Sequence, residues 1–126
     1  MDLKKLLDVS GADYISSRSN PRVVEYSKLK DDKGRDAIKL FLAEGVKLSR
    51  EALRHAHVHE ILFSESYVEK SDSCEIADLA RERSVKMTVL ADPAFEKIST
   101  EKSPQGVIAV VEYLADRHVS ENFDTW

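Results

Sequence analysis

The chain has 126 residues, of which 42% are apolar and 33% are charged, a composition typical of one soluble globular domain and too short for two. Its single cysteine excludes an internal disulfide, so nothing requires an oxidising compartment. No apolar run approaches membrane-spanning length, and the charged first residues do not resemble a signal peptide. We therefore expect a cytoplasmic protein with no membrane partner.

The net charge of −4 is distributed unevenly along the chain. Residues 17–50 hold nine Lys and Arg against five Asp and Glu, a local balance of +4, whereas the remainder holds ten basic and eighteen acidic residues, or −8. An even −4 would argue against nucleic acid, but this asymmetry is typical of a basic surface on an acidic body. A chance cluster of solvated charges would give the same count.

Helix signals come first along the chain. Residues 1–14 form an N-terminal extension, either a short amphipathic helix or a frayed terminus. Asn20 can cap a helix that begins at Pro21 and runs to about residue 30, because proline fits the first helical position. Asp31 and Asp32 can cap a second short helix through residue 38.

Short apolar runs then predict strands. The uninterrupted run 40–43 suits a strand buried on both faces, and Glu44 and Gly45 end it before a helix. The expected strands are 39–43, 60–64, 86–90 and 107–111, and the helices among them are 46–57, 71–83 and one beginning at Asp92. This alternation predicts an α/β fold, a small and mostly parallel (or mixed) sheet with helices on both faces.

Catalytic motifs are absent from the sequence. The four glycines are scattered singly, so there is no phosphate-binding loop, and no serine elbow or cysteine pair is found. His55, His57 and His59 alternate as ligands on one strand face would, but His55 should lie on a helix end, so the three would not share one geometry. We predict no catalytic, metal-binding or cofactor-binding residues in this chain.

Four sequence blocks resemble a known family. They are Ile-Ser-Ser-Arg-Ser-Asn-Pro-Arg at 15–22, Lys-Leu at 28–29, Phe-Leu-Ala-Glu-Gly at 41–45 and Ser-Pro-Gln-Gly-Val-Ile-Ala-Val at 103–110. Together they are similar to the N-terminal substrate-binding domain of SpoU/TrmH-type RNA ribose 2′-O-methyltransferases, over about 15–112. The resemblance implies a ribosomal-protein-like α/β/α sandwich that presents RNA to a knotted domain, and that knotted domain binds S-adenosylmethionine and transfers the methyl group.

The same resemblance implies a domain plan and partners. Residues 15–113 would be the RNA-binding domain and 114–126 a linker to a catalytic domain absent from this chain, since the knotted domain's motifs have no match here. The implied partners are RNA, above all rRNA, the protein's own catalytic domain, and a second copy in a full-length homodimer. A free-standing ribosomal-protein-like RNA-binding module is the alternative, and a third hypothesis is a small-molecule or partner-docking domain with no role in RNA binding.

RNA binding needs cations that neutralise phosphates and donors that fix the backbone. We predict such contacts from Arg18, Asn20, Arg22, Lys28, Arg35, Lys47, Arg50 and Gln105. The first three gather at a helix start, which favours phosphate. Two of the eight have competing structural roles, Asn20 as a plain helix cap and Arg35 as an ion-pair partner of Asp31 or Asp32.

Glu44 needs a partner, because a carboxylate at the end of a buried strand is costly when unpaired. If 107–111 runs antiparallel to 39–43, Gln105 and Gly106 lie beside Glu44 and Gly45. Glu44 would then accept hydrogen bonds from backbone N–H groups or from the Gln105 amide. We expect this scaffold role and not RNA contact, since a carboxylate repels phosphate.

Overall fold

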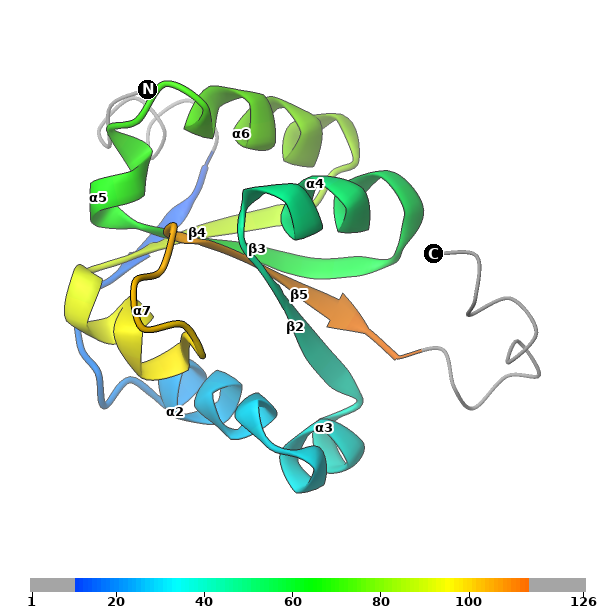
Figure 1. Ribbon diagram of the computed structural model, residues 1–126, viewed down its shortest axis with the longest axis vertical. Coiled ribbons are helices and arrows are strands. Elements are labelled where there is room, and N and C mark those ends of the chain that lie inside the picture. The colour runs from blue at the N-terminus through cyan, green and yellow to red at the C-terminus, as the bar shows by residue number, and fades with distance from the viewer. Residues whose placement is uncertain (1–10, 114–126) are drawn as a thin grey trace.

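A five-stranded sheet lies between two layers of helices in the computed structural model, which describes residues 11–113 (Figure 1). The strands are β1 (Asp13–Ile15), β2 (Leu40–Glu44), β3 (Val58–Ser64), β4 (Lys86–Leu90) and β5 (Val107–Glu112). The helices are α2 (Pro21–Ser27), the 3-10 turn η1 (Lys28–Lys30), α3 (Asp32–Ile38), α4 (Val46–His55), α5 (Glu65–Val68), α6 (Ser73–Glu82) and α7 (Asp92–Ile98). The expected α/β/α sandwich is confirmed.

The strand order is β1-β4-β3-β5-β2. Parallel pairing joins β1 to β4 and β4 to β3, whereas β5 is antiparallel to both of its neighbours. Ala43 lies opposite Ala109 and Glu44 opposite Ile108. The sheet is therefore mixed, and the last strand has the antiparallel direction, one of the two that the sequence left open.

Each face of the sheet carries its own hydrophobic core, because successive side chains of a strand point to opposite faces. In β3, Ile61 and Phe63 pack with residues of α4, α5 and α6, whereas Leu62 packs with residues of α2 and α7. All three are at most 1% exposed. Burying side chains of this size contributes about 1.5–3 kcal/mol each, so both helical layers are fixed to the sheet.

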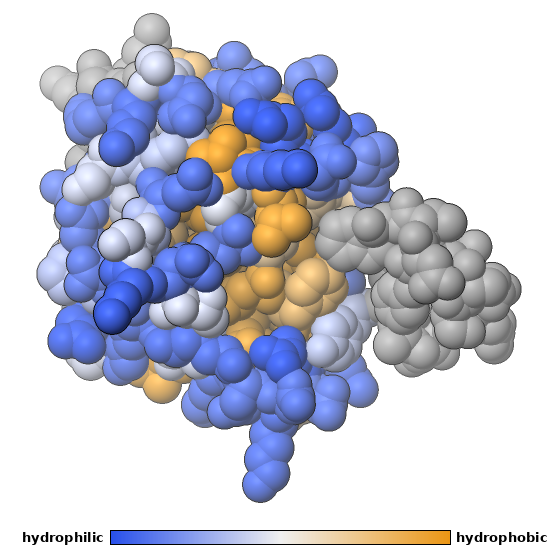
Figure 2. Space-filling view, in the orientation of Figure 1, coloured by the Kyte–Doolittle hydropathy of each residue, from blue (hydrophilic) through white to orange (hydrophobic). Residues whose placement is uncertain are grey.

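The expectation that strand 39–43 is buried on both faces was wrong. β2 lies at the edge of the sheet, with β5 as its one partner strand among residues 11–113, and only Ala43 in it is buried. Its other residues are half-buried because an edge strand lacks a neighbour on one side. Figure 2 shows the resulting apolar area over β2. On the neighbouring helix α4, Leu48 is 54% exposed. Strands β3 and β5 occupy the buried centre instead.

The local signals for the first helices were accurate. Asn20 caps α2 by accepting a hydrogen bond from the Arg22 N–H at 2.9 Å, and Asp31 caps α3 through the Gly34 N–H at 2.9 Å. The helix expected to reach residue 30 ends at Ser27 and tightens into η1. The sequence did not predict β1 or α5, which have three and four residues and therefore no readable period.

The ends of the chain lie outside this description. Most of the expected N-terminal extension and all of the expected linker 114–126 fall beyond residues 11–113, although β1 already begins at Asp13. Within the described part, no helix has the length and hydropathy needed to cross a membrane.

Candidate nucleic-acid interface

Five strand ends meet at one edge of the sheet, which we call the carboxyl edge because β1, β2, β3 and β4 all end there and antiparallel β5 begins there. Backbone hydrogen bonds join the loops to one another: the Gly45 N–H donates to the Val107 carbonyl at 2.9 Å, and the Ser64 N–H donates to the Gly106 carbonyl at 2.8 Å. Ligand sites commonly form at such an edge of an α/β sheet.

Glu44 holds one of these loops in place. Its carboxylate accepts hydrogen bonds from the Thr100 N–H at 2.9 Å, the Thr100 hydroxyl at 3.0 Å and the Ser99 hydroxyl. The predicted bonding to a backbone N–H is confirmed, whereas the Gln105 amide is not a partner. Glu44 therefore shapes the loop that follows α7.

Gln105 instead fixes the start of α4. Its Oε1 accepts a hydrogen bond from the Val46 N–H at 2.8 Å, and Gly45 leaves room for it, because a Cβ there would lie 2.9 Å from that oxygen. Gly106 has a φ of +110°, and a Cβ on it would lie 2.6 Å from the Ser64 Oγ. The loops of β2, β3 and β5 thus interlock at both glycines.

A cavity of about 180 Å³ opens beside Gln105 and Gly106 at this edge. Ser66 and Asp92 form part of its wall and are joined to each other, since the Ser66 N–H donates to Asp92 Oδ1 at 3.1 Å and the Ser66 hydroxyl donates to Oδ2. Glu96 lies on the same wall.

The carboxyl edge collects part of the predicted RNA-binding set. Arg18 and Asn20 lie in the loop after β1, Lys47 in the first turn of α4, and Gln105 before β5. The Arg18 and Lys47 side chains are exposed and have no hydrogen-bond or ion-pair partner among residues 11–113. Arg50 lies one turn further along α4 and pairs with Glu75 at 2.9 Å.

Sequence reasoning missed two lysines near this edge. Lys70 lines the cavity, and the Lys97 ammonium donates to the Arg18 carbonyl at 3.2 Å. Both residues lie outside the basic segment 17–50, from which the RNA-binding cations were predicted. Only their position in the fold shows their relation to the Arg18 loop.

Two of the predicted residues lie elsewhere. Lys28 in η1 and Arg35 in α3 belong to the elements that lead into the start of β2, at the amino end of the sheet. The predicted structural role of Arg35 is confirmed, since it pairs with Asp32 and also donates to the Leu29 carbonyl at 3.1 Å. The structure therefore does not bring these two cations together with Arg18 and Lys47.

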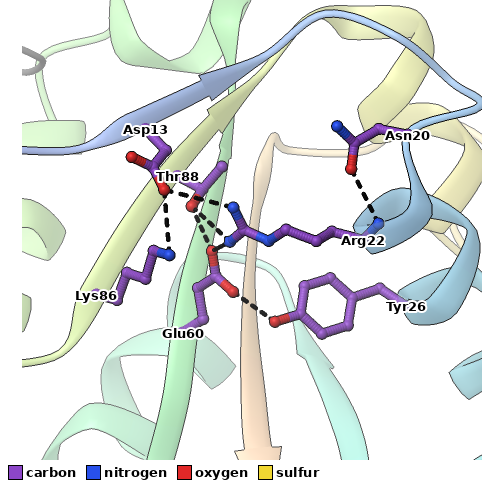
Figure 3. A network of polar contacts seen from close by, with 7 residues as sticks. All are labelled: Asp13, Asn20, Arg22, Tyr26, Glu60, Lys86 and Thr88. Atoms are coloured by element: carbon purple, nitrogen blue, oxygen red, sulfur yellow. Dashed lines mark hydrogen bonds and ion pairs between the residues drawn. The ribbon is translucent and has the colours of Figure 1, made fainter.

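Arg22 points into the molecule, where it belongs to a polar network beneath α2 (Figure 3). Its guanidinium pairs with Glu60 and contacts the Thr88 hydroxyl at 3.1 Å and Asp13 at 3.4 Å. Glu60 is 2% exposed and also accepts hydrogen bonds from the Tyr26 and Thr88 hydroxyls. Arg22 thus neutralises a buried carboxylate, a role the sequence did not predict.

The network also shifts the pKa values of the Asp13 carboxyl and the Tyr26 hydroxyl. A hydrogen bond from Lys86, at 3.1 Å, lowers the pKa of the Asp13 carboxyl, and the charges of Lys86 and Arg22 act in the same direction. Burial raises the pKa of the Tyr26 hydroxyl, and its hydrogen bond to Glu60 raises it further. Arg22 and Tyr26 stand four residues apart on α2 and so reach the same carboxylate, a spacing that could have indicated the network.

The three histidines do not form one site. His55 ends α4 and His59 lies in β3, so the expected difference in their geometry is confirmed. Among residues 11–113, no group of three or more His, Cys, Asp and Glu side chains is placed to hold a metal ion.

The mixed sheet has helices on both faces and interlocked loops of β2, β3 and β5 at its carboxyl edge, which defines an α/β/α sandwich domain without a recognisable catalytic constellation in its described part. A family model described as the MRM3-like substrate binding domain matches residues 20–109. The chain belongs to this family, and the resemblance noted in the sequence is confirmed. A search of curated proteins found no match.

Several solved RNA methyltransferases contain a domain with the same fold. An AdoMet-bound rRNA methyltransferase from Sinorhizobium meliloti matches with a TM-score of 0.66 and 22% identity, over 81% of this chain and 37% of that one. An RNA 2′-O ribose methyltransferase gives 0.67 and 21%, over 83% and 39%. The SpoU methyltransferase AviRb from Streptomyces viridochromogenes gives 0.59 and 24%, over 79% and 35%. The chain therefore spans well under half the length of these proteins.

Proposed function

We propose that this chain is the RNA-recognition domain of an S-adenosylmethionine-dependent rRNA 2′-O-ribose methyltransferase. It binds RNA at the carboxyl edge of its sheet and presents it to a catalytic domain of the same protein. The match of residues 20–109 to a substrate-binding family carries the proposal. Under this proposal the full-length protein acts in the cytoplasm as a homodimer, and the chain itself performs no chemistry.

The carboxyl edge supports RNA binding because it combines cations with fixed donors. Arg18 and Lys47 are exposed and unpaired among residues 11–113, so they are free to neutralise phosphates. The Gln105 Oε1 accepts a hydrogen bond from the Val46 N–H, so the two N–H donors of this exposed amide can bind a base edge or a 2′-hydroxyl. The interlocked loops hold these groups in a defined arrangement.

The cavity at the carboxyl edge does not fit S-adenosylmethionine. The cavity at the carboxyl edge, about 180 Å³, is smaller than the roughly 300–1,000 Å³ that enclose drug-sized ligands. A second cavity of about 340 Å³ lies at the amino end of β3, away from the carboxyl edge, and is lined by Arg54, Arg83 and Glu112 as well as by histidine and apolar side chains. We assign no step of methyl transfer to residues 11–113.

RNA binding can be tested with the 126-residue chain. Labelled RNA fragments that tile the ribosomal RNAs are titrated in fluorescence anisotropy at several salt concentrations. We expect a subset to bind with a clear salt dependence, and calorimetry to detect no binding of S-adenosylmethionine. Equal affinity for every fragment and for duplex DNA of the same length would contradict the proposal.

A further inference from the structure

The cavity at the carboxyl edge has a wall unlike that of a phosphate site. Two carboxylates, Asp92 and Glu96, line it against one cation, Lys70, together with the hydroxyl-bearing residues Ser64 and Ser66. Carboxylates repel phosphate and accept hydrogen bonds. The cavity is therefore built to receive a neutral group that offers donors.

Asp92 is held rigidly enough to select its partner. Both of its oxygens accept hydrogen bonds from Ser66, which fixes the plane of the carboxylate. An ionised carboxylate has about four lone-pair sites, so each oxygen keeps acceptor capacity for a ligand. The Glu96 carboxylate has no hydrogen-bond or ion-pair partner among residues 11–113.

The size and remaining lining fit a single planar ring system. A volume of about 180 Å³ lies below that of drug-sized pockets. Phe95 and Tyr67 line the cavity with rings that are only 1% exposed, whereas Lys70 and Gln105 are exposed and contribute donors. A nucleobase combines an apolar face with a polar edge, and single-stranded RNA is commonly recognised through such splayed-out bases.

We propose that this cavity receives one unpaired RNA base that carries an exocyclic amino group. The amino group donates to Asp92 or Glu96, while Lys70 and Gln105 contact the acceptors of the same base. Carboxylates pair in this way with the cytosine amino group in nucleic-acid complexes. Uracil has a carbonyl in place of that amino group and is disfavoured. This inference rests on the proposed RNA-binding function and adds to it the kind of nucleotide that is recognised.

Nucleosides test the cavity directly. The ¹⁵N-labelled chain is titrated with cytidine and with uridine, which differ chiefly in the amino group, and amide signals are followed by NMR. We expect cytidine to shift the signals of Ser66, Tyr67 and Gly106, with about tenfold weaker binding of uridine, the size of one charge-assisted hydrogen bond. Equal shifts with both nucleosides, or shifts confined to the Arg54 and Arg83 cavity, would overturn the proposal.

A matched RNA pair then tests the role of Asp92. Two hairpins identical except for one bulged nucleotide, C or U, are compared with the parent chain and with Asp92→Asn. We expect the parent to prefer the C bulge and the variant, which keeps its shape and its bond from the Ser66 N–H, to lose that preference. Asp36→Asn is the control, because Asp36 is exposed on α3 and makes the same change of charge at the amino end.

The outcomes separate this inference from the function it rests on. RNA binding that continues while the cavity does not respond to cytidine overturns the base proposal alone. A chain that binds none of the RNA fragments overturns the proposed function. A preference for the C bulge that survives in Asp92→Asn shows that the discrimination arises elsewhere, and the proposal fails.

Discussion

The two ends of the sheet each contain a carboxylate with three hydrogen-bond donors, but the donors differ. At the carboxyl edge, half-buried Glu44 accepts only neutral groups, from Ser99 and Thr100. Near the amino ends of β3 and β4, fully buried Glu60 faces the Arg22 guanidinium as well as two hydroxyls. The first carboxylate shapes an exposed loop, whereas the second joins α2 to three strands.

The difference between the two carboxylates decides which arginine side chains are available to bind RNA. Arg22 was expected to face RNA, but its charge offsets that of Glu60, and its side chain is 35% exposed. Arg18 lies only four residues earlier and pairs with no carboxylate among residues 11–113. Two basic residues of one motif therefore have different roles: Arg18 lies free on the surface within the described part, whereas Arg22 stabilises the fold. Replacing Arg22 would lower stability, so any loss of RNA binding in that variant could not be assigned to a lost contact.

The largest effect should come from Glu60. Glu60→Ala leaves the buried Tyr26 and Thr88 hydroxyls without their acceptor and the partly exposed Arg22 guanidinium without its ion-pair partner. We therefore expect a loss of about 2–4 kcal/mol in the free energy of unfolding, measured with urea. Replacing the set together, as Glu60→Leu with Arg22→Met and Tyr26→Phe, should recover most of it, because apolar side chains of similar size can substitute for a buried ion pair. A triple variant no more stable than the single one would contradict this explanation.

The next effect should come from the carboxyl edge. Glu44→Ala leaves the Thr100 N–H and two hydroxyls without an acceptor, so we expect a loss of about 1–3 kcal/mol by chemical denaturation. Glu44→Gln keeps an acceptor and should be mild. Glu112→Ala, at the exposed far end of β5, is the control and should stay within about 0.5 kcal/mol. If Glu44→Ala were as stable as the parent but bound RNA differently, Glu44 would belong to the binding site.

A third test compares the cations of the two ends directly. Arg18→Ala with Lys47→Ala removes two charges at the carboxyl edge, and Lys28→Ala with Arg35→Ala removes two near the amino end. We expect the first pair to weaken RNA binding about tenfold and to reduce the slope of log K against log salt by roughly 1.4, since each phosphate contact contributes to that slope. The second pair should change both much less. Equal losses would place RNA on both ends of the sheet.

The smallest expected effect concerns Asp13 and pH. Its pKa is lower in the folded than in the unfolded chain, so its contribution is present above the unfolded value of about 3.9 and disappears as the pH falls through the folded value. Asp13→Asn should therefore be slightly less stable than the parent at neutral pH and equal to it in strong acid. Urea unfolding at both pH values measures this, and a difference that grows in acid would contradict the sign.

Elements with a clear apolar run or helical spacing were predictable from the sequence, whereas the shortest elements and the side-chain partners were not. Strand 86–90 was predicted with the observed ends, because an apolar run bounded by polar turns leaves little choice. β1 was missed because two of its three residues are exposed, and its place depends on pairing with β4. Local pattern contains no information about such non-local pairing.

The sequence indicated which loops approach each other at the candidate site, but not the cavity wall or the partner of Arg22. The sequence placed Gln105 beside Glu44 and Gly45 only on the condition that the last strand is antiparallel, and the structure meets that condition. The cavity wall was not foreseen, because Ser66 and Asp92 are distant in sequence and meet only when α5 and α7 begin at the same edge. The partner of Arg22 was missed for a related reason: Glu60 stands at the start of an apolar run, where a solvated flank is the ordinary expectation.

The position of β5 has a consequence for how the domain is made. The last strand in sequence is an interior strand of the sheet, between β3 and β2. A chain emerging from a ribosome exposes the apolar residues of both neighbours until this strand follows them, and β2 has no strand to pair with in the meantime. Contacts so distant in sequence form slowly. Folding should therefore complete only after residue 112 has been released, and until then the unpaired strands are open to association with other nascent chains.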